Sequence, residues 1–379
     1  MSDWKSKVQA LFHSMDSLSD SMRSRVRKVT GFNNGLMIVP YLGYGTPDKL
    51  LLNGRVLKDE GFSPSRSADS TWQNLINMYK RFETDEVPGA RICALFQGVK
   101  KEVLADQEGY FSLEIGPAKP LDSRPWQEVE LELLDPPSRD GQRVRATAQV
   151  LVPPVTAKFG IISDVDDTVI STNVTNKLKM ILTVILLNEH TRKPFKGVGA
   201  FYRALHKGAS GSEGNPIFYV SSSAWNLYSL LVEFLKVQDI PIGPLFLRDF
   251  GDHLLFSSKD HQGHKMSNIK RILQAFPHLP FVLIGDSGEQ DPEIYRQVVK
   301  EYSGRIRVVY IRSVNRQASR IAAIDKLIEE VRQTGAQLVL TPDSEFAAAH
   351  AAAEGLISTG DLSTIRSEKK QDQSAPKQT

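Results

Sequence analysis

The chain has 379 residues, of which 41% are hydrophobic and 24% charged, and its formal net charge is +3 from 47 basic and 44 acidic side chains. This is the composition of a globular protein with enough apolar material for a full core, and the length favours two domains. So small a basic excess argues against a nucleic-acid-binding protein, and we expect no nucleic-acid partner. The single cysteine excludes an intramolecular disulfide and a cysteine zinc cluster, which fits a reducing compartment.

Residues 1–30 are predicted to form a separate amphipathic helix. Apolar residues recur at steps of four and three: Trp4, Val8, Leu11, Met15, Leu18 and Met22. This helix either docks on its own protein or a second copy, or lies at a membrane surface with Trp4 and Phe12 in the lipid boundary.

The hydropathy of the chain predicts neither a secretory signal nor a membrane span. Charged residues come early at the N-terminus, with no long apolar run behind them. The longest strongly apolar stretch, Met180–Leu187, is far shorter than the ~20 residues that a spanning helix needs. We therefore expect a cytoplasmic protein, free or peripheral to the inner membrane face.

Residues 31–154 are predicted to form a small antiparallel β-sandwich. Short β-rich runs are separated by Gly, Pro, Asp and Asn, and Glu128–Leu134 alternates polar and apolar residues with period two. One helical piece, residues 72–82, interrupts these runs. We find no catalytic constellation in this part of the chain.

Residues 155–357 are predicted to form an α/β catalytic domain with a doubly wound parallel sheet. Apolar strand-like runs alternate with helical segments, as expected for a parallel sheet covered on both faces. The runs are residues 159–163, 217–221, 245–249, 281–286 and 307–312. A short Ala-rich helix follows near residue 350, and residues 358–379 are predicted to be a disordered tail because they are rich in Ser, Lys, Gln and Asp.

Polar groups stand at the ends of these predicted strands, where open parallel sheets bind their ligands. Asp164 ends the first strand and Asp166 lies two residues further on. Ser221 and Ser222 follow the second strand, and Asp286 ends the fourth. Carboxylates that converge at one sheet edge repel each other and need a cation, and Mg²⁺ prefers such oxygen ligands.

This pattern predicts phosphoryl transfer to a carboxylate. Asp164, held by its strand, is the better nucleophile, and Asp166 in the loop can act as general acid and then base. Ser221 can donate a hydrogen bond to the phosphoryl oxygens, and Lys265, at the start of a helical segment, supplies positive charge.

Asp164-Val165-Asp166-Asp167-Thr168 resembles the first motif of the haloacid dehalogenase superfamily. Ser221, Lys265 and Gly285-Asp286 with Asp291 resemble its second, third and fourth motifs in the same order. The resemblance implies a magnesium-dependent phosphatase in which Asp164, the backbone carbonyl of Asp166 and Asp286 hold the ion and Asp291 supports it. Thr168 and Ser222 would then contact substrate.

A narrower resemblance is to the actin-patch-protein type of phosphatidate phosphatase. It rests on SDVDDTVIST, FYVSSSAWNLY, GPLFLRDFG and FPHLPFVLIGDSGEQDPEIY. PYLGYGTPDKLLLNGRV and DQEGYFSL resemble the β-domain that precedes the catalytic part in bacterial relatives. The resemblance implies phosphatidate as substrate, with diacylglycerol and phosphate as products. Relatives often have Asn-Ser-Pro where this chain has Ser222-Ser223-Ala224.

Several residues keep a second interpretation. Asp291 precedes Pro292 and a helix, so it either caps that helix or supports the metal. Arg248 either pairs with a neighbouring acid or contacts the substrate phosphate. His261 and His264 lack further zinc ligands nearby, and we assign them to a loop flanking Lys265.

The apolar segment Met180–Leu187 also has two interpretations, a core helix over the sheet or a cap element that faces an acyl chain or membrane. Two alternatives remain for function as well. One is a phosphatase of soluble phosphomonoesters or nucleic-acid ends, and the other is a non-catalytic interaction or scaffold protein.

Overall fold

The computed structural model describes residues 35–59, 86–138, 141–165, 196–248, 261–314 and 317–373. Four predictions therefore lie outside the described residues: the N-terminal helix, the helical piece at 72–82, the loop that carries Asp166 and Thr168, and the apolar segment 180–187. Within the described residues, no helix is both long and apolar enough to cross a bilayer.

The N-terminal part is a sheet of eight strands. They are β1 (Gly35–Pro40), β2 (Gly43–Thr46), β3 (Lys49–Asp59), β4 (Arg91–Phe96), β5 (Val99–Leu104), β6 (Tyr110–Ile115), β7 (Trp126–Asp135) and β8 (Arg145–Leu151). Their order is β1-β3-β2-β8-β7-β4-β5, and β6 pairs with β3. The pairs are antiparallel as predicted, except that β2 and β8 run parallel.

One continuous sheet replaces the two separate sheets of the predicted sandwich. The link is β2, which pairs with β3 on one side and with β8 on the other and so joins β1, β3 and β6 to β8, β7, β4 and β5. The predicted alternation in β7 is confirmed: Val129 and Leu131 are buried, whereas Glu128 and Glu130 are exposed. These inward residues form a core of their own.

The C-terminal part contains a parallel sheet, as predicted, with six strands where the sequence predicted five. They are β9 (Gly160–Asp164), β10 (Ile217–Ala224), β11 (Leu245–Arg248), β12 (Phe281–Asp286), β13 (Ile306–Arg312) and β14 (Gln337–Thr341). The order is β11-β10-β9-β12-β13-β14, and β14 was not anticipated from the sequence. The order reverses between β9 and β12, the point at which sheets of this kind bind ligands.

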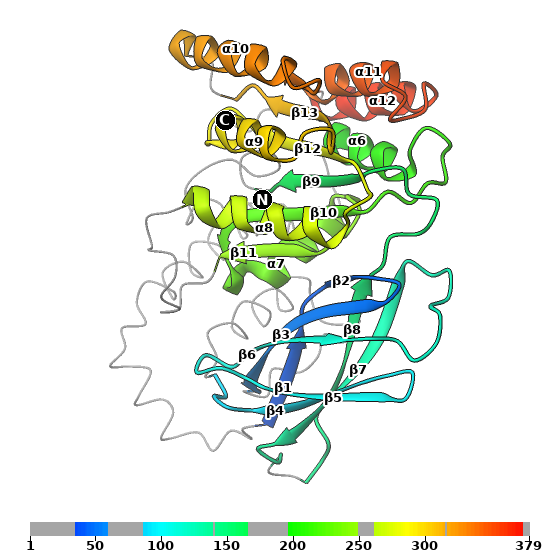
Figure 1. The fold of residues 1–379 in the computed structure, drawn as a ribbon, viewed down its shortest axis with the longest axis vertical. Coiled ribbons are helices and arrows are strands. Elements are labelled where there is room, and N and C mark those ends of the chain that lie inside the picture. The colour runs from blue at the N-terminus through cyan, green and yellow to red at the C-terminus, as the bar shows by residue number, and fades with distance from the viewer. Residues whose placement is uncertain are drawn as a thin grey trace, which may run out of the picture.

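Helices cover both faces of this sheet (Figure 1). They are α6 (Lys196–Lys207), α7 (Tyr228–Val237), α8 (His261–Ala275), α9 (Asp291–Glu301), α10 (Ala318–Arg332), α11 (Ser344–Ala353) and α12 (Asp361–Gln373). Ile161 points into a core shared with α6, α7, α11 and α12, and Ile162 points into a core shared with α8, α9 and α10. Fully buried strands with both faces apolar are what such a sheet requires.

The prediction of a disordered tail from residue 358 is wrong for residues 361–373, which form α12. Ile365 is buried in the core, and Arg203 on α6 pairs with Glu368 at 2.7 Å. Polar composition concealed a helix because only one narrow apolar stripe, Leu362 and Ile365, is needed to dock it.

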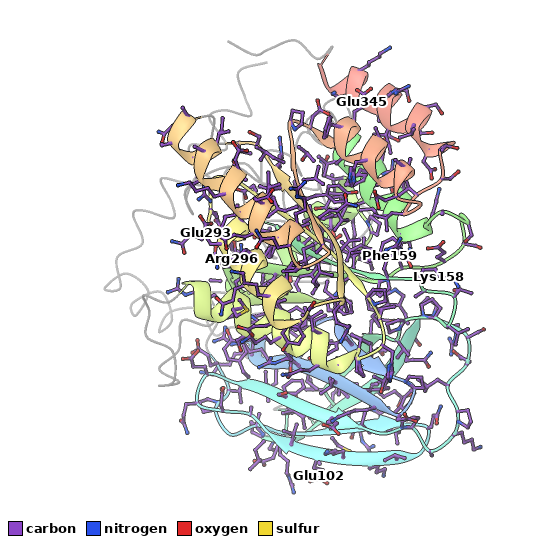
Figure 2. The ribbon with its side chains drawn as sticks, turned by 45° about the horizontal axis from the view of Figure 1, so that its top comes forward. Glu102, Lys158, Phe159, Glu293, Arg296 and Glu345 are labelled. Atoms are coloured by element: carbon purple, nitrogen blue, oxygen red, sulfur yellow. The ribbon has the colours of Figure 1, made fainter. Side chains whose placement is uncertain are left out.

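The two parts are stacked end to end, with Glu102 on β5 and Glu345 on α11 at opposite ends (Figure 2). The segment from β1 to β2 packs against the C-terminal part. Tyr41 lies in the core that contains α7, and Tyr44 contacts the rings of Phe218, Phe246 and Phe276. The N-terminal sheet is thus packed directly against the edge of the parallel sheet at β10 and β11.

Candidate active site

Asp164, Lys265 and Asp291 meet at the carboxyl end of β9. The Lys265 ammonium donates to Asp164 Oδ1 at 2.9 Å and to Asp291 Oδ1 at 2.5 Å. All three side chains are buried, although they come from a strand end, the second turn of α8 and the first residue of α9. The structure therefore brings together three of the residues that the sequence analysis selected.

Asp286 completes the cluster from the end of β12. Its Oδ1 accepts hydrogen bonds from the backbone N–H groups of Gly288 at 2.6 Å and Glu289 at 3.1 Å, which fixes the turn after the strand. Its own N–H donates to Asp291 Oδ2 at 3.2 Å. Asp286 is fully buried.

Asp291 does not cap α9, so that interpretation is wrong. Gln290 occupies the capping position without a side-chain cap, and Asp291 is the first helical residue. Its carboxylate turns toward Lys265 and the Asp286 amide. Gly285 allows this, because a Cβ there would lie 2.8 Å from the Asp291 Cγ and closer still to Oδ2.

One carboxylate oxygen from each of Asp164, Asp286 and Asp291 lies within 4.8 Å of the other two. The Lys265 ammonium contacts two of these three carboxylates, so with all three ionised the cluster holds more negative than positive charge in a buried place. Uncompensated charge there is costly, and a hard divalent cation with oxygen ligands would relieve it. The donor set therefore fits Mg²⁺.

Lys265 is held as the ammonium ion. Burial by itself lowers the pKa of a lysine, but the charges of Asp164 and Asp291 raise the pKa of Lys265 well above its ordinary value. Lys265 therefore stays positively charged at neutral pH and can face an anionic group.

Ser221 lies beside the nucleophile candidate. In the β9–β10 pairing, Val220 is opposite Asp164, so Ser221 follows directly beyond it. Ser221 is 1% exposed, and its Oγ accepts a hydrogen bond from the Ser223 N–H at 2.9 Å. Ser222 is partly exposed between them. The last residues of β10 thus place hydroxyl groups at the same edge as Asp164.

The remaining residues that were predicted to belong to the site are not placed in the cluster. Asp166 and Thr168 lie outside the described residues. Arg248 is the last residue of β11 and is partly exposed, while its neighbour Asp249 also lies outside. The loop assignment for His261 and His264 is wrong, because α8 begins at His261. Lys265 consequently lies in the second turn of the helix and does not open it.

Two residues that the sequence analysis did not select also shape the site. Glu289 Oε2 lies 3.2 Å from the Lys265 ammonium. Arg320 on α10 donates to the backbone carbonyls of Ser287 at 2.9 Å and Glu289 at 2.6 Å, and it pairs with Glu293. Arg320 therefore clamps the turn between Asp286 and Asp291, a role with no sequence motif.

Comparison with known proteins places this site within a recognised catalytic segment. Residues 159–313 match the family described as phosphatidate phosphatase APP1, catalytic domain. The segment runs from just before β9 to just after β13, so it contains every residue of the cluster. The predicted resemblance to phosphatidate phosphatases is therefore confirmed for this part of the chain.

Two curated relatives are similar to parts of this chain. Phosphatidate phosphatase APP1 of Saccharomyces cerevisiae is 30% identical over 169 residues, which are 44% of this chain and 28% of that protein. An uncharacterized protein of Schizosaccharomyces pombe is 28% identical over 264 residues, 68% of this chain and 41% of that protein. The chain spans less than half the length of either relative.

Solved structures give only distant similarity. A carbohydrate acetylesterase from Xanthomonas citri is 12% identical with a TM-score of 0.25, over 78% of this chain and 75% of that one. The PilB minor pilin from Streptococcus sanguinis is 10% identical with a TM-score of 0.26, over 76% and 90%. Neither score indicates a common fold.

Proposed function

We propose that the protein is a magnesium-dependent phosphatase that hydrolyses phosphatidate to diacylglycerol and phosphate through an aspartyl-phosphate. The observation that carries the proposal is the buried pair of Asp164 and Lys265 at the reversal point of the parallel sheet. The catalytic domain would be of the haloacid dehalogenase type, which agrees with Asp164 and Asp286 as the last residues of their strands and with Ser221 in the last half of β10.

In the first step, a carboxylate oxygen of Asp164 attacks the phosphorus atom. The bond from phosphorus to the leaving oxygen breaks, and Asp166 gives that oxygen a proton. In the second step, Asp166 takes a proton from water, and the resulting hydroxide attacks the phosphorus. The bond to the Asp164 oxygen breaks, which releases inorganic phosphate and restores both carboxyl groups.

The remaining groups bind and orient the substrate. The Lys265 ammonium neutralises charge on the phosphoryl oxygens, and the Ser221 hydroxyl donates a hydrogen bond to them. Thr168, Ser222 and Arg248 are proposed as further substrate contacts from their positions after the strands. Attack by one anion on another requires such compensation, because the two repel each other.

Mg²⁺ would be held by Asp164, the backbone carbonyl of Asp166, Asp286 and Asp291. When bound, it supplies positive charge next to the phosphoryl group. The cluster of buried oxygen atoms is what supports this assignment.

Phosphatidate is proposed as substrate because of the match at residues 159–313 and the similarity to the yeast enzyme of that name. A phospholipid substrate also implies contact with a membrane surface from the cytoplasmic side. The excess of negative charge in the cluster favours catalysis over a scaffold role, because a non-catalytic protein has no need to bury it.

The test is phosphate release from detergent-dispersed phosphatidate, with and without Mg²⁺, for the natural protein and Asp164→Asn. Asp325→Asn, at an exposed position of α10, is the matched control. We expect magnesium-dependent release that only Asp164→Asn abolishes. Wild-type activity in Asp164→Asn would contradict the mechanism. If phosphate is released from an aryl phosphate but not from the lipid, the substrate is a soluble phosphomonoester. If phosphate is released from neither, the scaffold alternative is favoured.

A further inference from the structure

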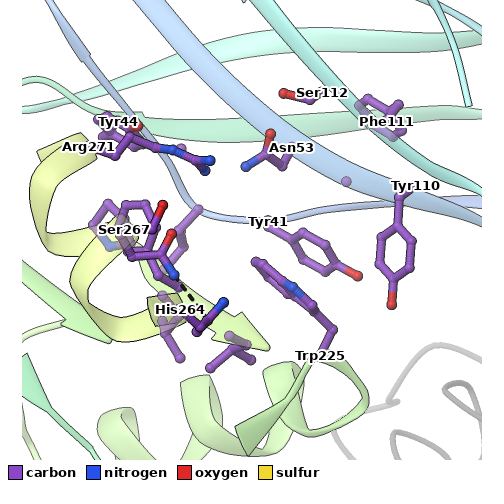
Figure 3. Close-up of a pocket in the computed structure, with 18 of the residues that line it drawn as sticks. Tyr41, Tyr44, Asn53, Tyr110, Phe111, Ser112, Trp225, His264, Ser267 and Arg271 are labelled. Atoms are coloured by element: carbon purple, nitrogen blue, oxygen red, sulfur yellow. Dashed lines mark hydrogen bonds between the residues drawn. The ribbon is translucent and has the colours of Figure 1, made fainter. Parts of the chain in front are cut away.

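A cavity of about 420 Å³ lies between the N-terminal sheet and the parallel-sheet part (Figure 3). Both parts contribute walls to it. Its main side chains are Tyr41, Asn53 and Tyr110 from the first part and Trp225, His264 and Arg271 from the second. A cavity of this size at a domain interface is within the range of ~300–1,000 Å³ that small-ligand pockets occupy.

The cavity shares α8 and the end of β10 with the groups assigned to the phosphate. His264 directly precedes Lys265 on α8, and Trp225 directly follows β10, which carries Ser221. Leu245 and Leu247 of β11, the neighbouring edge strand, line it as well. Asn268, three positions after Lys265 on α8, lines the cavity too, and residues three apart are neighbours on a helix surface. The cavity therefore borders the part of α8 that carries Lys265, where a group attached to the phosphate can extend.

One wall of the cavity is aromatic. The rings of Tyr41 and Trp225 are stacked at 4.3 Å, and Figure 3 shows Tyr110 facing them. Tyr110 is itself held by Arg55, whose guanidinium lies 4.4 Å from the ring centroid. Rigid aromatic side chains offer apolar contact area at little entropic cost, which suits an aliphatic group.

The opposite wall carries hydrogen-bond donors. Figure 3 shows the Arg271 guanidinium and the Asn53 amide pointing toward one another, with Ser267 and His264 below. Two acids, Asp106 and Glu108, also line the cavity. The Asp106 carboxylate accepts hydrogen bonds from the backbone N–H groups of Glu108 and Tyr110 at 2.9 Å each. Donors opposite an apolar wall fit a chain that carries carbonyl oxygens, such as an acyl ester.

We propose that this cavity receives an acyl-ester portion of the substrate, so that the N-terminal sheet supplies half of the leaving-group site. The inference rests on the proposed function and adds a role for the N-terminal sheet. Tyr41, Tyr110 and Asn53 would then determine substrate class, although they take no part in the chemistry.

The test reduces the free volume of the cavity with a substitution in the N-terminal sheet, which carries none of the catalytic groups. Ser112 lines it on β6, and Ser112→Trp adds bulk there. The measured quantity is the ratio of kcat/KM for dispersed phosphatidate to kcat/KM for p-nitrophenyl phosphate. We expect this ratio to fall at least tenfold, since a poor fit in an apolar pocket changes specificity by ~10–200-fold. Tyr110→Ala, which removes part of the aromatic wall, should lower the same ratio.

Thr147→Trp is the control, because Thr147 is exposed on β8 and outside the cavity lining. Its ratio should equal that of the natural protein. If both cavity variants keep the natural ratio, or lose both activities equally, the inference is wrong while the proposed function stands. If the natural protein itself releases phosphate only from p-nitrophenyl phosphate, the proposed function fails and the inference fails with it.

Discussion

The Lys265 ammonium lies 2.9 Å from the Asp164 carboxylate, although the two residues are 101 positions apart in the chain. The parallel sheet produces this meeting, because β9 ends at Asp164 and α8 packs on the sheet face beside it. Lys265 also donates to Asp291, so one ammonium compensates two of the buried carboxylates. Both the stability of the site and its proposed chemistry therefore depend on this one side chain.

Lys265→Met should lower both stability and activity. Breaking a buried ion pair from one side costs about 3–5 kcal/mol, because the remaining charges stay buried. We expect the free energy of unfolding in urea to fall by that order and phosphate release to fall by about 10²–10³-fold. Lys326→Met, exposed on α10, is the control and should change neither. A stable and active Lys265→Met would contradict both assignments.

Mg²⁺ should stabilise the natural protein against heat. An ion that binds only the folded state adds about 2.7 kcal/mol at a concentration of 100 times its Kd, so Tm should rise with added Mg²⁺. Asp286→Asn removes one charged ligand from the cluster and should reduce the Tm rise. Asp325→Asn should keep it. An equal rise in all three proteins would mean that Mg²⁺ binds elsewhere.

Gly285→Ala should disturb the site through a steric clash with Asp291. The new Cβ would lie 2.8 Å from the Asp291 Cβ and Cγ, so Asp291 must move away from Lys265 or the strand must shift. Overpacking of this kind costs about 1–3 kcal/mol. We expect a loss of that size in urea unfolding, together with weaker Mg²⁺ binding by thermal shift.

The matched control for Gly285→Ala is Gly116→Ala. A Cβ at Gly116 would approach only the Asp48 carbonyl, at 3.4 Å. This substitution should leave stability within about 0.5 kcal/mol, as surface changes usually do. If Gly285→Ala behaves in the same way, the close approach of Asp291 is not needed for the site.

Much of the site could be predicted because its residues are tied to strand ends. Apolar runs locate β9, β10 and β12, and parallel topology brings their carboxyl ends to one edge. Asp164, Ser221 and Asp286 follow from that rule alone. Arg320 and Glu289 could not be found in this way, because their contacts depend on how α10 and the turn after β12 pack.

The fold was less predictable where long-range pairing decides it. The alternation within β7 identifies a half-buried strand, but it does not say which strands are its neighbours. The pairing of β2 with both β3 and β8 is what joins the strands of the predicted sandwich into a single sheet. Likewise, α12 is polar almost throughout, and its two apolar contacts with the core have no composition signal.

Tyr228→Phe should weaken the junction between the two parts. The Leu42 N–H donates to the Tyr228 hydroxyl at 2.6 Å, and Tyr228 also contacts the Tyr41 ring. Leaving a buried N–H without its acceptor costs about 1–3 kcal/mol, and the partly buried Leu42 N–H should lie at the lower end of that range. We expect urea unfolding to show a loss of this size, whereas Tyr302→Phe, at the partly exposed end of α9, should lose under about 0.5 kcal/mol. Because this bond anchors the segment that carries Tyr41, the same variant should also lower the ratio of phosphatidate to p-nitrophenyl phosphate hydrolysis. Full stability in Tyr228→Phe would show that aromatic packing alone joins the two parts.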